Sequence, residues 1–222
     1  MRRALLLGLA VLLTACAPRA TTPPEGRPTL VPPAVAYRLR LEAPGSTGEI
    51  TLTAAFEYLM GRSNKALPTY RIDGTITQTD DLGTWRFYFA PLDILDPESL
   101  AQVHGIGVQF RNGLRDTIEV EWARSAIVDQ GGRARSVIHR GVRLVDRNDP
   151  SAPSTIPAGA VLDDFLFPAD LITYRSGRLG MWTAVGFLER LQPGQVVTLS
   201  LGLRITGQPA ERAFRFRAAP PP

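Results

Sequence analysis

The chain has 222 residues, of which 25 are Lys or Arg and 21 are Asp or Glu, and 44% of its residues are hydrophobic. The formal net charge of +4 is small for this length, so the composition does not indicate a nucleic-acid-binding protein. The single cysteine excludes an intramolecular disulfide, and a fold without disulfides must be stabilised by its hydrophobic core.

The first sixteen residues have the pattern of an export signal. Arg2 and Arg3 precede an apolar run from Ala4 to Leu13, which is about half the length of a membrane-spanning helix. The run ends in the tetrapeptide Leu-Thr-Ala-Cys at residues 13–16.

This tetrapeptide resembles the lipobox of bacterial lipoproteins, in which the cysteine receives lipid and the preceding peptide is removed. The resemblance implies acyl chains on Cys16, and two or more chains anchor a protein stably where one holds it only marginally. Because Ala17 stands where an aspartate would favour the inner membrane, the resemblance further implies the outer membrane, facing the periplasm, if the host has two membranes. The alternative is an ordinary secreted protein with a chance cysteine.

Residues 17–35 contain six prolines and no hydrophobic periodicity, which is typical of an extended tether. We therefore predict a signal peptide over 1–15, a lipidated cysteine with a proline-rich linker over 16–35, and one folded domain over 36–219. Removal of Arg2 and Arg3 with the signal would leave 23 basic and 21 acidic residues, a net charge of +2.

Beyond the linker, apolar and polar residues alternate with a period of two, which predicts antiparallel strands with one buried face. The predicted strands cover residues 37–41, 50–58, 70–76, 85–89, 106–110, 118–122, 197–205 and 214–216. Turn residues separate them at Pro44-Gly45, Asp80-Asp81-Leu82-Gly83, Gly131-Gly132, Pro157-Ala158-Gly159 and Pro193-Gly194. A short helix is predicted to begin at Asp96, and residues 182–191 fit a strand or a short helix equally well.

Eight to ten short strands with frequent turns predict an all-β fold, specifically an antiparallel β-sandwich. The segment from Phe110 to Leu203 resembles small bacterial envelope lipoproteins that have immunoglobulin-like domains and no assigned activity. This resemblance is carried by the polar cluster from Asn112 to Gly141, by residues 154–159 and by the pair Pro193-Gly194. It implies a fold and a location, and it carries over no functional residue.

Ser125, Asp129 and His139 are the residue types of a hydrolytic triad. However, Ser125 lacks the Gly-x-Ser-x-Gly elbow that exposes a nucleophile, and Asp129 precedes Gly131 and Gly132 as a turn residue would. We therefore predict that Asp129 accepts backbone hydrogen bonds within a hairpin turn, that His139 lies on the surface of the return strand, and that the three residues are not catalytic.

No metal or cofactor is predicted. The two histidines, His104 and His139, are 35 residues apart, and lipidation of Cys16 would leave no thiol for zinc. Several aspartates could supply oxygen ligands for calcium, but they lack the spacing of a calcium-binding loop, and a solvated acidic loop is the favoured interpretation. These aspartates are Asp146, Asp149, Asp163, Asp164 and Asp170.

Two further clusters have a functional and a structural interpretation. Five arginines within fifteen residues could bind an anionic ligand or simply form a solvated surface: Arg133, Arg135, Arg140, Arg143 and Arg147. The alternating aromatics Trp85, Phe87 and Phe89 are predicted to be core residues rather than a ligand platform.

Together these observations predict a non-enzymatic, lipid-anchored protein of the cell envelope with a structural or binding role. The favoured variant is an accessory subunit that docks on an envelope assembly through a protein partner, with no nucleic acid involved. Two alternatives remain open: a carrier of a hydrophobic or glycan ligand, and a serine hydrolase that uses the Ser125 region.

Overall fold

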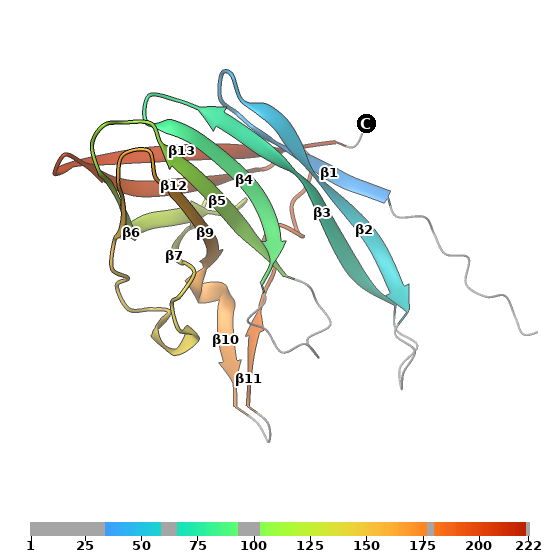
Figure 1. Ribbon diagram of the computed structural model, residues 1–222. Helices are drawn as coiled ribbons and strands as arrows, with labels where there is room; N and C mark the ends of the chain where they lie inside the picture. The colour runs from blue at the N-terminus through green and yellow to red at the C-terminus, as the bar shows by residue number, and fades with distance from the viewer. Residues whose placement is uncertain (1–33, 59–65, 93–102, 177–179, 221–222) are drawn as a thin grey trace, which may run out of the picture. The chain divides into compact units, whose positions relative to one another are not determined.

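The computed structural model describes residues 34–58, 66–92, 103–176 and 180–220 (Figure 1). They belong to one compact unit of the chain, and Cys16, the predicted signal peptide and the predicted helix start at Asp96 lie outside the described residues. Strands, turns and 3-10 turns make up the described residues, so the prediction of an all-β fold is confirmed. Within these ranges, no helix has the length and apolar content needed to cross a membrane.

Every predicted alternating run lies within an observed strand. The strands are β1 (Ala34–Leu41), β2 (Thr47–Tyr58), β3 (Ala66–Thr79), β4 (Gly83–Pro91), β5 (His104–Asn112), β6 (Ile118–Val128), β7 (Ala134–Ile138), β8 (Ser154–Ile156), β9 (Val161–Pro168), β10 (Ile172–Arg175), β11 (Met181–Ala184), β12 (Val196–Ile205) and β13 (Gln208–Ala219). Two 3-10 turns, η1 (Leu144–Asp146) and η2 (Ala169–Leu171), lie between them. Residues 182–191, for which the sequence fitted either a strand or a short helix, form the end of β11 and the turns that follow it.

Ten of the described strands form a closed, antiparallel, barrel-like sheet. Their order is β12-β13-β1-β2-β3-β4-β5-β9-β7-β6, and β6 pairs with β12 to close the ring. Figure 1 shows β1 to β5 side by side, with the β10–β11 hairpin projecting away from them. The predicted immunoglobulin-like sandwich is therefore wrong, because a sandwich has two separate sheets whereas here the hydrogen bonding continues around the ring.

A bulge in β6 accompanies this closure. Residues 122–125 stand opposite Leu201 alone, so the strand is divided into two halves that both pair with β12. The half before the bulge also pairs with β8, and the half after it pairs with β7. The bulged strand β6 therefore pairs with three other strands. The pattern of apolar and polar residues within β6 does not predict these pairings.

Aromatic side chains fill the space enclosed by the sheet. Trp85 stacks on Phe110 with ring centroids 3.8 Å apart, and Phe87 meets Phe216 of β13 edge-on at 5.1 Å. Trp85 and Phe87 are fully buried and Phe89 is nearly so, which confirms that these residues belong to the core. Each such buried side chain contributes about 1.5–3 kcal/mol of hydrophobic free energy.

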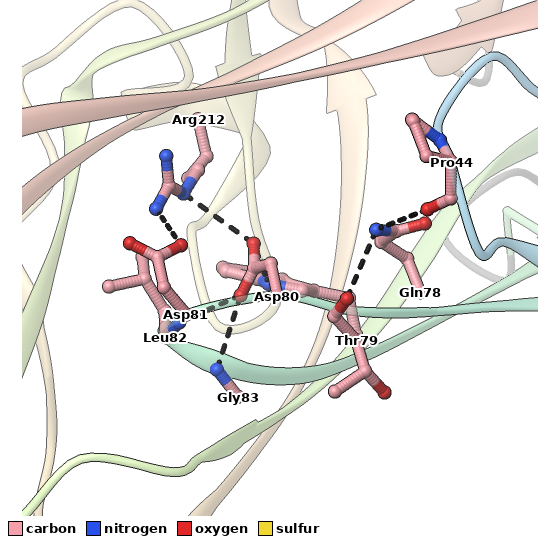
Figure 2. A network of polar contacts seen from close by, with 9 residues as sticks. Pro44, Gln78, Thr79, Asp80, Asp81, Leu82, Gly83 and Arg212 are labelled. Carbon is pink, nitrogen blue, oxygen red and sulfur yellow. Dashed lines mark hydrogen bonds and ion pairs between the residues drawn. The ribbon is translucent and has the colours of Figure 1, made fainter.

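Asp80 organises the turn between β3 and β4 (Figure 2). Its Oδ1 accepts the N–H groups of Leu82 at 2.9 Å and Gly83 at 3.2 Å, and its Oδ2 accepts the indole N–H of Trp85 at 3.0 Å. Arg212 of β13 forms ion pairs with Asp80 and with the next residue. The turn is therefore tied both to the core and to the C-terminal strand.

The five predicted turns are confirmed by backbone geometry, since each contains a glycine with positive φ. These glycines are Gly45, Gly83, Gly132, Gly159 and Gly194. At Gly83 a side chain is also excluded by space, because a Cβ would lie 2.0 Å from the carbonyl oxygen of Arg111.

Candidate functional site

The hydroxyl of Ser125 is engaged by the backbone of the β6 bulge. Oγ donates to the carbonyl of Glu121 at 3.0 Å and accepts the N–H of Gly202 on β12 at 3.1 Å. Ser125 is only 4% exposed. These two bonds join β6 to β12 where the bulge interrupts the regular ladder, so Ser125 holds the closing strand pair together.

Asp129 forms the predicted turn. Its Oδ1 accepts the N–H groups of Gly131 at 2.9 Å and Arg133 at 3.0 Å, and its Oδ2 bonds Arg135 at 2.8 Å. Partial burial raises the pKa of Asp129, but the hydrogen bonds from Arg133, Arg135 and Gly131 together outweigh burial and lower it. The prediction that Asp129 serves the hairpin is confirmed.

His139 pairs with Asp164 rather than with Asp129. Its Nδ1 lies 3.1 Å from Oδ2 of Asp164, and its ring stacks on Trp122 with centroids 4.5 Å apart. The other oxygen of Asp164 accepts the N–H of Arg140 at 2.8 Å. His139 therefore lies wedged between a buried carboxylate and an indole, with its side chain 14% exposed, and not on the surface as predicted.

A cavity of about 260 Å³ opens on the outer face of the sheet beside this His–Asp pair. We call it the outer cavity; its lining includes Tyr88, Leu92, His139, Arg140, Val142 and Phe165. Apolar side chains form most of its wall, and the lining also includes the imidazole-bearing His139 and the basic Arg140. Among the described residues that line it there is no Ser, Thr or Cys, so the cavity offers none of the usual nucleophilic side chains of acyl transfer.

Two glycines of β5 leave room for the aromatic side chains that line the outer cavity. A Cβ at Gly107 would lie 2.2 Å from the ring of Tyr88, and one at Gly105 would lie 2.3 Å from the ring of Phe165. Each aromatic ring therefore lies directly over the β5 backbone. This site was not predicted from the sequence, although glycines at alternate strand positions are a signal that a neighbouring group approaches the backbone closely.

Tyr88, which lines the outer cavity, is bonded to Asp163 of β9. The phenol hydroxyl donates to Oδ1 of Asp163 at 2.8 Å. Burial and this hydrogen bond raise the pKa of Tyr88, whereas the nearby Arg140 opposes the rise. Asp163 points outward while Asp164 is buried, as expected for successive residues of a strand.

Four of the five clustered arginines are bound by carboxylates, backbone carbonyls or an aromatic ring of the same chain. Arg135 pairs with Asp129 and Asp170, and Arg133 reaches Asp170 at 3.3 Å. Arg143 and Arg147, the other two, are held by neighbouring groups, with Arg143 on Asp146 and Arg147 on backbone carbonyls and Trp182.

Arg140 differs from these four. Within the described residues, its guanidinium has no carboxylate at ion-pair distance, and it lines the outer cavity. The positive charge at this cavity therefore has no acidic partner in the described part of the fold.

A second His–carboxylate pair is buried near the start of β5. Nδ1 of His104 lies 2.8 Å from Oε1 of Glu189, and the same oxygen accepts the His104 backbone N–H at 2.9 Å. Tyr37 donates to the carbonyl of Leu188 beside this pair. These bonds tie the 185–191 loop to β1 and β5, so His104 has a structural role in the described fold.

In the described ranges, no three of His, Cys, Asp or Glu are grouped as a metal site. Comparison of the chain with protein-family models, with curated proteins and with solved structures finds no match.

Proposed function

We propose that this protein is a lipid-anchored, non-catalytic binding subunit of the cell envelope, which docks on a protein partner through the outer cavity. The observation that carries the proposal is the contrast between two groups of polar side chains. Ser125 and Asp129, the hydrolytic candidates, are bonded to backbone groups, whereas Arg140 presents a charge without a carboxylate partner in the described fold beside an apolar cavity.

The chemistry of the cavity specifies the docking segment. Its volume of about 260 Å³ is below the roughly 300–1,000 Å³ of typical small-molecule pockets, which favours a single large apolar side chain of a partner. An acidic residue next to that side chain would satisfy Arg140 by a bidentate ion pair. A carrier of a hydrophobic or glycan ligand is the second candidate, since the same wall is largely apolar.

The anchor in this proposal rests on the sequence around Cys16. In the proposed arrangement, acyl chains hold the protein at the membrane and the proline-rich linker separates the folded unit from it. Metabolic labelling with a fatty-acid analogue should label the wild type and not Cys16→Ser. A Cys16→Ser protein that still takes up the label would contradict lipidation at this residue.

Docking is tested by photo-crosslinking in cells that express the full chain. A photoreactive phenylalanine at Val142 in the cavity should give a protein adduct of discrete mass, while the same residue at exposed Ala213 on β13 should not. Arg140→Glu should abolish the adduct, because it reverses the charge that the partner recognises. Equal adducts at both positions, or an adduct that persists in Arg140→Glu, would contradict the proposed interface.

A further inference from the structure

A second cavity, of about 310 Å³, lies on the outer face of β3, β4 and β5. We call it the arginine pocket; its lining is Thr77, Thr84, Arg86, Gln109, Arg111 and Val161. No carboxylate belongs to this lining among the described residues. Two guanidiniums, two hydroxyls and one amide therefore supply hydrogen-bond donors from three adjacent strands.

The strand register places the two arginines side by side. Arg86 is paired with Gln109 across β4 and β5, and Arg111 is paired with Thr84 in the next outward-facing position. Side chains at such diagonal positions of an antiparallel pair start about 7–8 Å apart. Two long guanidinium side chains at this separation can both reach a ligand group that sits between them.

The other arginines of the ten strands in the ring are paired with carboxylates. Arg38 and Arg40 pair with Glu49, Arg215 and Arg217 pair with Glu42, Arg204 pairs with Glu121, and Arg212 pairs with Asp80 and Asp81.

Arg86 and Arg111 depart from this pattern. Neither has a carboxylate at ion-pair distance within the described part of the chain, and Arg111 makes only a 3.4 Å bond to the carbonyl of Gly159. Two like charges close together on one sheet face disfavour each other, and a bound anion would remove that cost.

Asp163 is an acidic residue that the strand register places beside a residue of this pocket. It is paired with Gln109 in the register of β5 and β9, but its Oδ1 accepts the hydroxyl of Tyr88 instead of an arginine. Asp163 therefore stands at the edge of the arginine pocket as a negative charge that would repel a bound anion.

We propose that Arg86 and Arg111 form a binding site for an oxyanion, namely the carboxylate or phosphate group of an acidic ligand. Each guanidinium can donate two parallel hydrogen bonds to such a group, and Thr77, Thr84 and Gln109 can donate to its remaining oxygens. This site is separate from the outer cavity and does not depend on the docking function proposed above.

The site is tested by calorimetric titration of the full chain in detergent at low ionic strength, with inorganic phosphate and with glucuronate as probes. Arg111→Gln and Arg86→Gln should each weaken binding by about tenfold or more, since each removes a charged, bidentate donor. Arg40→Gln is the matched control, because it removes the same charge from a site already paired with Glu49, and it should change affinity by less than about twofold.

Two more variants make the test independent of folding defects. Arg111→Lys keeps the charge but loses the fork, so it should bind more weakly than the wild type, and Asp163→Asn should bind more tightly because it removes the repelling carboxylate. The stronger of the two probes identifies the oxyanion as phosphate or carboxylate. The proposal is overturned if neither probe binds, or if Arg40→Gln weakens binding as much as Arg111→Gln does.

Discussion

At the scale of single residues, Ser125 shows how one hydroxyl can support the closure of a sheet. At the bulge in β6, Oγ of Ser125 bonds both the Glu121 carbonyl and the Gly202 N–H. A buried backbone group that loses its only partner retains the full cost of leaving water. The hydroxyl is therefore expected to matter for stability.

Replacement of Ser125 by Ala should lower the free energy of unfolding by about 1–3 kcal/mol, because it removes both hydrogen bonds that this buried hydroxyl makes to the backbone. Urea denaturation measures this loss. Ser136→Ala, at an exposed position of β7, is the control and should change stability by no more than about 0.5 kcal/mol. A fluorophosphonate probe should not label the wild type; labelling that disappears in Ser125→Ala would establish a nucleophile and refute this role.

Asp129 should make stability depend on pH in the acidic range. Its pKa is lowered in the folded protein from its ordinary value of 3.8, so its contribution is fully present above that value and is lost as the pH falls through the folded pKa. The difference in unfolding free energy between wild type and Asp129→Asn should therefore be largest near neutral pH and should shrink below about pH 4. A difference that grows on acidification would contradict the assignment.

The two residues also show what sequence reasoning could and could not reach. The role of Asp129 was predictable because a turn depends on residues that are close in the chain, and aspartate before two glycines is typical of one. The role of Ser125 was not, because its acceptor and donor belong to a bulge that exists only when β6 meets β12. The outer cavity was missed for the same reason, since Tyr88 and Phe165 come together only when β4 and β9 flank β5.

At the scale of strands, alternation predicted β1 to β6, β12 and β13 but did not predict β7, β8, β9 or β10. In β9 the consecutive residues Leu166, Phe167 and Pro168 are all buried, so the strand shows no simple period of two. It lies between β5 and β7, where neighbours cover more of its surface. Periodicity indicates a strand only when water covers one of its faces.

The contact between β4 and β9 gives a prediction for the phenol of Tyr88. Burial and the hydrogen bond to Asp163 both raise the pKa of Tyr88, so Asp163→Asn should lower that pKa by removing the charge that opposes phenolate formation. Phenolate absorbance across an alkaline titration measures the change, and Tyr88→Phe identifies which step belongs to this residue. An unchanged titration in Asp163→Asn would show that the two side chains are not in contact in solution.

At the scale of the whole molecule, the ring brings the first and last strands together. β1 pairs with β13, and Phe214 and Phe216 of β13 pack on Trp85 and Phe87 of β4 across the interior. The sequence predicted both terminal strands but not this pairing, because the choice between a closed ring and two sheets depends on which distant edges meet. Closure also removes edges that would otherwise be free to pair with other chains.

We expect residues 34–220 to fold alone as an all-β unit without a metal. The interior is apolar and aromatic, and no metal-like grouping occurs in the described residues, so the fold should be stabilised by its core and by ring closure. Circular dichroism should show little helix, and EDTA should leave the melting temperature unchanged. A chelator-induced fall of several degrees would support the calcium interpretation of Asp146, Asp149 and Asp163.

Ring closure is tested by the same segment ending at Gly207, which lacks β13. This shorter segment loses the aromatic contacts with β4 and exposes the edges of β1 and β12. It should therefore lose cooperative unfolding.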